Sequence, residues 1–193
     1  MSAAPRLLAF AGSLRTGSFN KKLLKVAAEA ATEAGAEVTV ADLRDFPMPL
    51  YDGDIESSTG LPEPAKRLKA LFLENDGLLI ASPEYNGSMT APLKNALDWV
   101  SRREGEEPPL AAYRGKTAAL VSASPGALGG VRALVHVREV LLNMGVLVIP
   151  QRHALSRANT VFDEAGAMTD AQQEAAVMAV AAALVETTRK LAS

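Results

Sequence analysis

The chain has 193 residues, of which 48% are hydrophobic and 22% charged, a balance typical of one globular domain that spans residues 1–193. Twenty lysines and arginines against 22 acidic residues give a net charge of −2, so overall charge offers no argument for a nucleic-acid partner. The sequence contains no cysteine, which excludes disulfides, thiolate nucleophiles and iron–sulfur ligation. Its two histidines, His136 and His153, are far apart in sequence and leave little basis for a metal site.

The apolar stretches are too short for targeting or for crossing a membrane. Leu7 to Ala11 is shorter than the apolar part of a signal peptide. The longest uncharged apolar stretch, Ala175 to Val185, is well short of the ~20 residues that span a bilayer. We therefore expect a cytoplasmic protein that has no membrane partner.

Short apolar runs alternate along the chain with segments of helical period. Residues 7–11 form a continuous apolar run, as expected of a buried parallel strand, and a helix is predicted from about 18 to 34. Residues 37–40 alternate between polar and apolar types, which favours an edge strand. The segment 44–60 is rich in Pro, Asp, Gly and Ser but carries Phe46, Met48 and Tyr51, so it is predicted to be a long functional loop.

The same alternation continues to the end of the chain. The patterns predict helices at 62–74, from Thr90 to about 100, at 129–144 and at 170–191, and strands at 77–81, 116–122 and 146–149. Five strands and five helices in strict alternation indicate an α/β fold with an open, doubly wound five-stranded parallel sheet in a single domain. Ligands of such sheets bind beyond the carboxyl ends of the strands, which directs attention to the loops 12–20, 82–90 and 122–130.

The first of these loops has the composition of a phosphate site. It joins a buried strand to a helix start and contains three hydroxyls, the amide of Asn20 and the guanidinium of Arg15. Lys21 and Lys22 fall in the first helical turn, where the dipole disfavours cations, so they are easier to explain beside a bound anion, although simple solvation is the alternative.

The spacing of this loop excludes two common nucleotide motifs. Gly12 and Gly17 have the spacing of a triphosphate loop, but Ser18 and Phe19 follow where that motif needs Lys and Ser or Thr. No Gly-x-Gly-x-x-Gly follows any predicted strand. A single terminal phosphate is therefore favoured over a pyrophosphate.

The second loop has the residues needed to hold the edge of a flat heteroaromatic ring. Pro83 and Gly87 define a rigid path that a ligand can approach closely, while Tyr85 and Asn86 offer an apolar edge and an amide. The alternative is a plain turn, because Pro, Asn and Gly are ordinary turn residues. No second carboxylate or histidine lies close to Glu84 in sequence, so it receives no acid–base role.

The third loop is small and rich in glycine. Donors at the start of the helix that follows it could stabilise negative charge on a reduced ring, and tight packing is the alternative explanation. The chain has no Gly-x-Ser-x-Gly motif for a hydrolase serine. We expect His136 on a helix surface, His153 in a loop, and Trp99 at an interface or at the edge of the core.

Four sequence blocks together resemble one known family. The blocks are residues 12–20, 42–51, 82–88 and 93–102, and they are similar to those of the NADPH-dependent FMN reductases of flavodoxin-like fold, which include bacterial quinone and chromate reductases and azoreductases. The resemblance implies that the FMN phosphate is held by Ser13, Arg15, Ser18 and Asn20. It also implies that the isoalloxazine edge is held by Pro83, Glu84, Tyr85, Asn86 and Gly87, and that the pyrimidine end lies near Ser124 and Gly126.

The resemblance further implies a ping-pong reaction in which NADPH or NADH reduces FMN, and FMN reduces a quinone or a similar small acceptor such as chromate, an azo compound or free flavin. On this reading the chain supplies neither a catalytic side chain nor a metal, since FMN carries the chemistry. Relatives of this kind form homodimers or homotetramers. The alternatives are a flavodoxin-like electron carrier and an FMN-binding sensor without NAD(P)H turnover. The near-neutral charge and Arg15 argue against the carrier.

Overall fold

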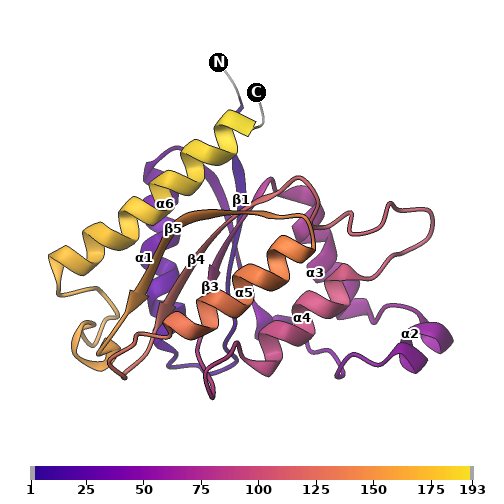
Figure 1. Cartoon of the computed structure of the whole chain (residues 1–193), viewed down its shortest axis with the longest axis horizontal. Coiled ribbons are helices and arrows are strands. Elements are labelled where there is room, and N and C mark those ends of the chain that lie inside the picture. Colours follow the sequence, from indigo (N-terminus) through magenta and orange to yellow (C-terminus); the bar gives the residue numbers. More distant parts are fainter. Residues whose placement is uncertain (1–2, 192–193) are drawn as a thin grey trace.

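A five-stranded parallel sheet is the centre of the computed structural model, which describes residues 3–191 (Figure 1). Its strand order is β2-β1-β3-β4-β5. The strands are β1 (Arg6–Ala11), β2 (Glu37–Asp42), β3 (Gly77–Ala81), β4 (Thr117–Ala123) and β5 (Leu147–Leu155). The chain reverses its direction of strand addition at β1, so the predicted doubly wound parallel sheet is confirmed.

Helices cover both faces of this sheet (Figure 1). One face packs against α1 (Phe19–Glu33) and α6 (Ala171–Leu191). The other packs against α3 (Glu63–Glu74), α4 (Ala91–Ser101) and α5 (Val131–Asn143). The short helix α2 (Gly53–Thr59) extends away from the sheet, and two single 3₁₀ turns, η1 (Leu43–Asp45) and η2 (Ala158–Thr160), complete the set within residues 3–191.

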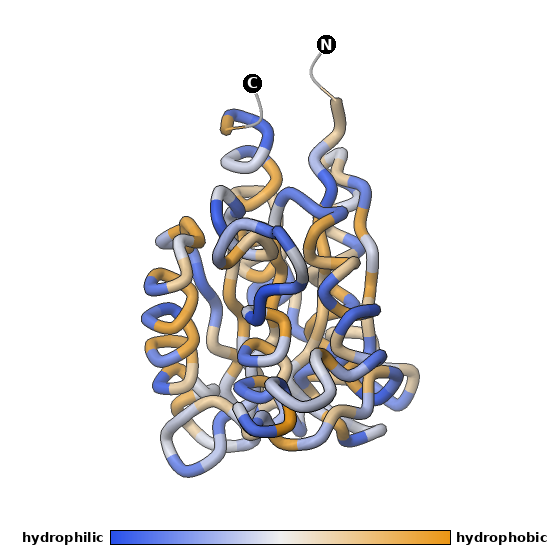
Figure 2. The backbone as a smooth tube through the Cα atoms, turned by 90° about the vertical axis from the view of Figure 1, so that its right-hand side faces the viewer, coloured by the Kyte–Doolittle hydropathy of each residue, from blue (hydrophilic) through white to orange (hydrophobic). Residues whose placement is uncertain are grey.

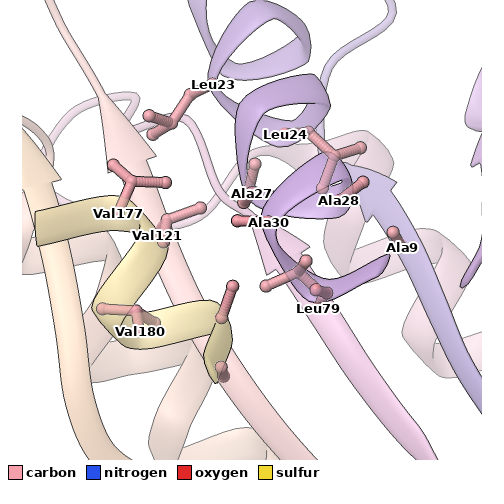
Figure 3. Close-up of a cluster of buried hydrophobic side chains, with 14 of the residues drawn as sticks. Ala9, Leu23, Leu24, Ala27, Ala28, Ala30, Leu79, Val121, Val177 and Val180 are labelled. Atoms are coloured by element: carbon pink, nitrogen blue, oxygen red, sulfur yellow. The ribbon is translucent and has the colours of Figure 1, made fainter. Parts of the chain in front are cut away.

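Alternate side chains of the central strands divide the core into two layers. In β1, Leu7 and Ala9 face α1 and α6, whereas Leu8 and Phe10 face the opposite helices. Figure 3 shows the first layer, in which side chains from α1 and α6 meet those of three strands. The helices contribute only one face each, and Figure 2 shows hydrophobic and hydrophilic residues alternating along them.

The segment from 44 to 60 differs from the predicted continuous loop, because it contains α2 and part of η1. The Asp52 carboxylate accepts a hydrogen bond from the amide of Asp54 at the start of α2, and Gly60 ends the helix at φ 74°. All 7 residues of α2 are exposed or half-buried, so this helix leaves no periodic apolar pattern. Residues 3–191 therefore hold six α-helices instead of the expected five.

The last strand is longer than predicted. It continues past Ile149 through Pro150 and a polar stretch to Leu155, and its register against β4 shifts between Ala118 and Leu120. An edge strand tolerates a proline and polar residues, which hid the extension in the sequence. As a result His153 lies in a strand, so its expected place in a loop was wrong.

Trp99 lies at the edge of the core, as predicted, because it is buried but belongs to neither of the two main core clusters. Its ring is fully buried in α4, at 0% exposure, and its Nε1 donates to the carbonyl oxygen of Pro49 at 2.8 Å. It packs edge-on against Tyr51, with ring centroids 5.0 Å apart. The tryptophan therefore holds the segment before α2 against α4.

Candidate functional site

Loops 12–20, 82–90 and 122–130 follow β1, β3 and β4, which are adjacent in the sheet. The backbone amide of Gly12 donates to Ala81 at 2.9 Å, and the hydroxyl of Thr90 donates to the carbonyl of Gly12 at 2.5 Å. The amide of Ser82 donates to Val121 at 2.9 Å. The three loops predicted from the sequence therefore do form one continuous edge.

The first loop leaves polar groups available at the start of α1. Ser18 is the N-cap residue, and within residues 3–191 its side chain makes no capping hydrogen bond. Ser13 is buried, and its hydroxyl accepts from the amide of Arg15 at 3.3 Å. The Arg15 side chain is exposed and has no partner in the described part of the chain. An unfilled first helical turn beside a guanidinium without a partner offers the kind of hydrogen-bond donors that anions bind.

Asn20 is used differently from the other predicted phosphate ligands. Its Nδ2 donates to the carbonyl of Ala123 at 2.8 Å, and its Oδ1 accepts from the amide of Ala123 at 3.0 Å. The side chain is buried and ties the first turn of α1 to the end of β4. Asn20 thus holds the first and third loops together.

The side chains of Lys21 and Lys22 contact other groups of the protein, so neither is evidence for a bound anion. The Nζ of Lys21 lies 2.5 Å from Oδ2 of Asp42. The Nζ of Lys22 donates to the carbonyl of Asp163 at 3.5 Å and lies 5.7 Å from the ring centroid of Phe162. Contacts within the fold therefore account for both charges.

The second loop is a two-residue hairpin. Asn86 and Gly87 both have positive φ, at 52° and 79°, and Tyr85 and Ser88 exchange backbone hydrogen bonds at 3.0 and 3.1 Å. Pro83 is buried, whereas the Tyr85 side chain is 51% exposed. The Nδ1 of His136 lies 2.9 Å from the Ser88 hydroxyl, so α5 supports the hairpin. His136 is exposed on that helix, as predicted.

Glu84 fastens this loop to the start of α5. Its carboxylate accepts from the amides of Arg132 and Ala133 at 3.0 and 3.3 Å and from Nε of Arg132 at 2.7 Å. Burial alone would raise the pKa of Glu84, but the hydrogen bonds from Arg132 and Ala133 outweigh it and leave the pKa below its ordinary value. The group is an ionised helix cap, consistent with the absence of an assigned acid–base role, and only its backbone remains free for a ligand.

The third loop divides into a packed end and an exposed stretch. Gly129 has φ 63°, and a Cβ there would lie 2.5 Å from the carbonyl oxygen of Ala154. The Ser122 hydroxyl donates to the Gly129 carbonyl at 2.7 Å. Residues 125–128 are exposed, and the hydroxyl of Ser124 accepts from the amide of Gly126 at 3.1 Å. Tight packing explains the glycines at the end of this loop, while its middle, residues 125–128, remains accessible.

A cleft of about 900 Å³ beside the first loop was not predicted. It lies between residues 14–16, the segment 43–50 and the start of α4 at 91–96. One of its residues, Arg44, donates from Nη1 to the hydroxyl of Thr16 at 2.5 Å. The only sequence signal for this wall was the unusual presence of Phe46 and Met48 in a polar segment.

Residues 3–191 contain neither a candidate metal site nor a helix fit to span a membrane. No group of three or more histidine and acidic side chains has an arrangement that could hold a metal ion. None of the helices in that range combines the length and the hydrophobicity that a bilayer crossing needs.

A doubly wound parallel sheet of this strand order, with three adjacent loops at its carboxyl edge, defines a flavodoxin-like fold. The chain belongs to the NADPH-dependent FMN reductase family, whose sequence profile matches residues 5–160.

Named relatives agree with this assignment. An NAD(P)H-dependent FMN reductase of Pseudomonas aeruginosa is 36% identical over 171 residues, which cover 88% of each chain. A quinone reductase of Escherichia coli is 36% identical over 152 residues, covering 77% of this chain and 76% of the relative. Among solved structures, the flavoenzyme FerB of Paracoccus denitrificans, an NAD(P)H:(acceptor) oxidoreductase, has a TM-score of 0.82 and 28% identity over 97% of this chain and 98% of its own.

Proposed function

We propose that the three loops at the carboxyl edge of the sheet bind FMN, with its phosphate at the start of α1. The observation that carries this proposal is the combination of an uncapped Ser18 hydroxyl and an unpaired Arg15 guanidinium, both judged within residues 3–191. A phosphate oxygen beside the first turn of α1 would give both groups a partner and would interact favourably with the helix dipole. Ser13 would complete the phosphate loop.

The remaining predicted residues take two kinds of role. We expect the backbone of Pro83, Glu84, Tyr85, Asn86 and Gly87 to meet the edge of the isoalloxazine ring, and Ser124 and Gly126 to lie near its pyrimidine end. Asn20 and the Glu84 carboxylate act as positioning residues, because their side chains already bind Ala123 and the start of α5. The accessible hairpin and the exposed stretch 125–128 support this division.

The protein is an NAD(P)H-dependent FMN oxidoreductase that reduces quinones. The chemistry that FMN supplies when bound is acceptance of hydride from NAD(P)H and reduction of the acceptor. The residues of the chain bind and orient the cofactor, and no acid–base pair is needed from the residues that the structure describes. We further propose that chromate, azo compounds and free flavin are additional acceptors, that the enzyme is a homodimer or homotetramer, and that it acts in the cytoplasm.

Anaerobic mixing of FMN-loaded protein with NADPH, followed by benzoquinone, tests this function. We expect bleaching of the flavin absorbance by NADPH and its return on addition of the quinone. The matched control is NADPH and benzoquinone with the same concentration of free FMN. Bound FMN that NADPH and NADH leave oxidised would instead indicate an electron carrier or a sensor, and failure to retain FMN would overturn the cofactor assignment.

A further inference from the structure

The apolar cleft beside the first loop carries two positive charges and few free polar groups. Most of its walls come from apolar side chains such as Leu14, Phe46 and Met48. Its lining contains no acidic residue within the described range 3–191. A volume of about 900 Å³ is ample for an aromatic ligand.

The neutral polar side chains of this cleft already make hydrogen bonds within the fold. Oδ1 of Asn95 accepts from the amide of Tyr51 at 2.7 Å, and its Nδ2 donates to the carbonyl of Pro49 at 2.9 Å. The hydroxyl of Thr16 accepts from Arg44. Apart from the hydroxyl hydrogen of Thr16 and one N–H of Asn95, the free hydrogen-bond donors on the cleft's side chains are those of the Arg15 and Arg44 guanidinium groups, which are also its positive charges.

Arg44 is oriented by its neighbours but keeps its charge available. Its backbone amide donates to Oδ1 of Asp42 at 3.0 Å, which fixes the turn after β2. The other oxygen of that carboxylate pairs with Lys21. The Arg44 guanidinium uses one N–H on Thr16, and its remaining N–H groups can bind an anion in a bidentate manner.

We propose that Arg44 selects substrates that carry both an oxyanion and an aromatic ring, with the ring in the cleft and the oxyanion on the guanidinium. This inference rests on the proposed function, because it assigns Arg15 to the FMN phosphate and leaves Arg44 for the substrate. Two sources of the oxyanion share this chemistry: an anionic substituent on the acceptor and the 2′-phosphate of NADPH. The proposal makes Arg44 a specificity residue that FMN retention does not need.

The first test measures binding without turnover. Calorimetry of the FMN-loaded protein with naphthalene-2-sulfonate, a ligand that cannot be reduced, is compared for wild type, Arg44→Met and Arg44→Lys. We expect Arg44→Met to weaken binding about tenfold, the usual effect of losing one charge-assisted contact, and Arg44→Lys to fall between. The neutral 2-naphthol should bind wild type and Arg44→Met alike. Arg103→Met is the matched control, because Arg103 is exposed and outside the cleft.

The second test distinguishes the two sources of the anion. The kcat/KM ratio of 1,2-naphthoquinone-4-sulfonate to 1,2-naphthoquinone reports on the acceptor, and the ratio of NADPH to NADH reports on the 2′-phosphate. We expect Arg44→Met to lower at least one ratio about tenfold while the Kd for FMN stays within about twofold.

Two results would overturn the proposal. Both ratios and sulfonate binding could remain at the wild-type level, in which case Arg44 selects nothing. Alternatively, FMN affinity could fall as far as the ratios do, which would place Arg44 in the cofactor site. Failure of the proposed function itself is seen separately, as wild-type protein that neither retains FMN nor consumes NAD(P)H.

Discussion

The two ends of the central sheet use charged residues in opposite ways. At the amino end, Arg6 pairs with Asp76 at 3.1 Å, and the buried Nζ of Lys116 donates to the carbonyl of Asn75. At the carboxyl end, Arg15 and Arg44 are exposed, and neither forms an ion pair within residues 3–191. Arg6 and Lys116 therefore have partners at the amino end. At the carboxyl end Lys21 and Glu84 are paired, but Arg15 and Arg44 form no ion pair in the part of the chain that the structure describes.

The pKa values of Lys116 and Asp76 reflect the burial and the pairing of charges at the amino end. Burial lowers the pKa of Lys116, and the charge of Asp76 opposes that effect only in part. Burial would raise the pKa of Asp76, but its hydrogen bonds with Arg6 outweigh burial and lower it. These groups hold the ends of strands together and have little capacity left for a ligand.

The largest expected change in stability comes from adding a side chain at Gly129, where the backbone of the third loop packs tightly. Gly129→Ala places a Cβ against the carbonyl of Ala154 at a positive φ, so we expect a loss of roughly 3 kcal/mol or more in the free energy of unfolding. Urea denaturation followed by circular dichroism measures it. Gly17→Ala is the control, since its Cβ would meet nothing within 4 Å. Equal stability of the two variants would contradict the packing described for the third loop.

Asn20→Ala should have the next largest effect, because it leaves the buried amide and carbonyl of Ala123 without their side-chain partner. We expect a loss of about 2 kcal/mol in the free energy of unfolding, together with weaker FMN binding as the third loop moves. Asn20→Asp keeps the acceptor and has a donor only when its carboxyl is protonated, so its stability should be low at neutral pH and should approach that of wild type at low pH. If Asn20→Ala were as stable as wild type, the hydrogen bonds between Asn20 and Ala123 would not contribute to the free energy of unfolding.

A substitution at the amino end of the sheet should lower the free energy of unfolding without changing FMN affinity. The hydroxyls of Thr117 and Thr188 are 2.6 Å apart and buried, and the Thr188 hydroxyl also donates to the carbonyl of Leu184. Thr117→Val removes one of these bonds at nearly constant volume and should cost about 1 kcal/mol. FMN affinity should not change. A fall in FMN affinity would contradict the independence of the two ends.

The smallest expected effect is a pH dependence at Glu84. Since its folded pKa is lowered, the stability that it contributes is present above the usual glutamate pKa of roughly 4.3 and is lost as pH falls through the folded pKa. The difference in free energy of unfolding between wild type and Glu84→Gln should therefore be below about 1 kcal/mol at neutral pH. It should shrink further in acid, and a difference that grows as pH falls would refute the pairing with Arg132.

The sequence predicted the parts of the fold that bury apolar side chains. Runs such as Leu7 to Ala11 and Gly77 to Ala81 became central strands, and their order along the chain led to the three loops. Helix α2 escaped prediction because its residues stay near the surface, and the end of β5 escaped because Pro150 and polar residues interrupt its pattern. The periodicity of apolar residues predicts helices and strands that bury one face well. It does not reveal a helix or strand whose residues lack a periodic apolar pattern.

Long-range contacts account for the site features that the sequence did not reveal. The partner of Asn20 is 103 residues away, and the cleft joins Leu14 to Asn95. Lys21 looked like part of an anion site until the fold brought Asp42 beside it. The order of strands and helices predicted the three loops and their composition suggested their chemistry, but only the fold shows which of their side chains already have partners.

The most direct test of the account is the Kd for FMN of Arg15→Met, compared with that of Arg6→Met at the opposite end of the sheet. Loss of a charge-assisted phosphate contact should raise the Kd of Arg15→Met by roughly 10- to 100-fold. Arg6→Met should bind FMN as the wild type does, since Arg6 is paired with Asp76 far from the loops. Equal FMN affinity in both variants would contradict the claim that the carboxyl end holds the phosphate.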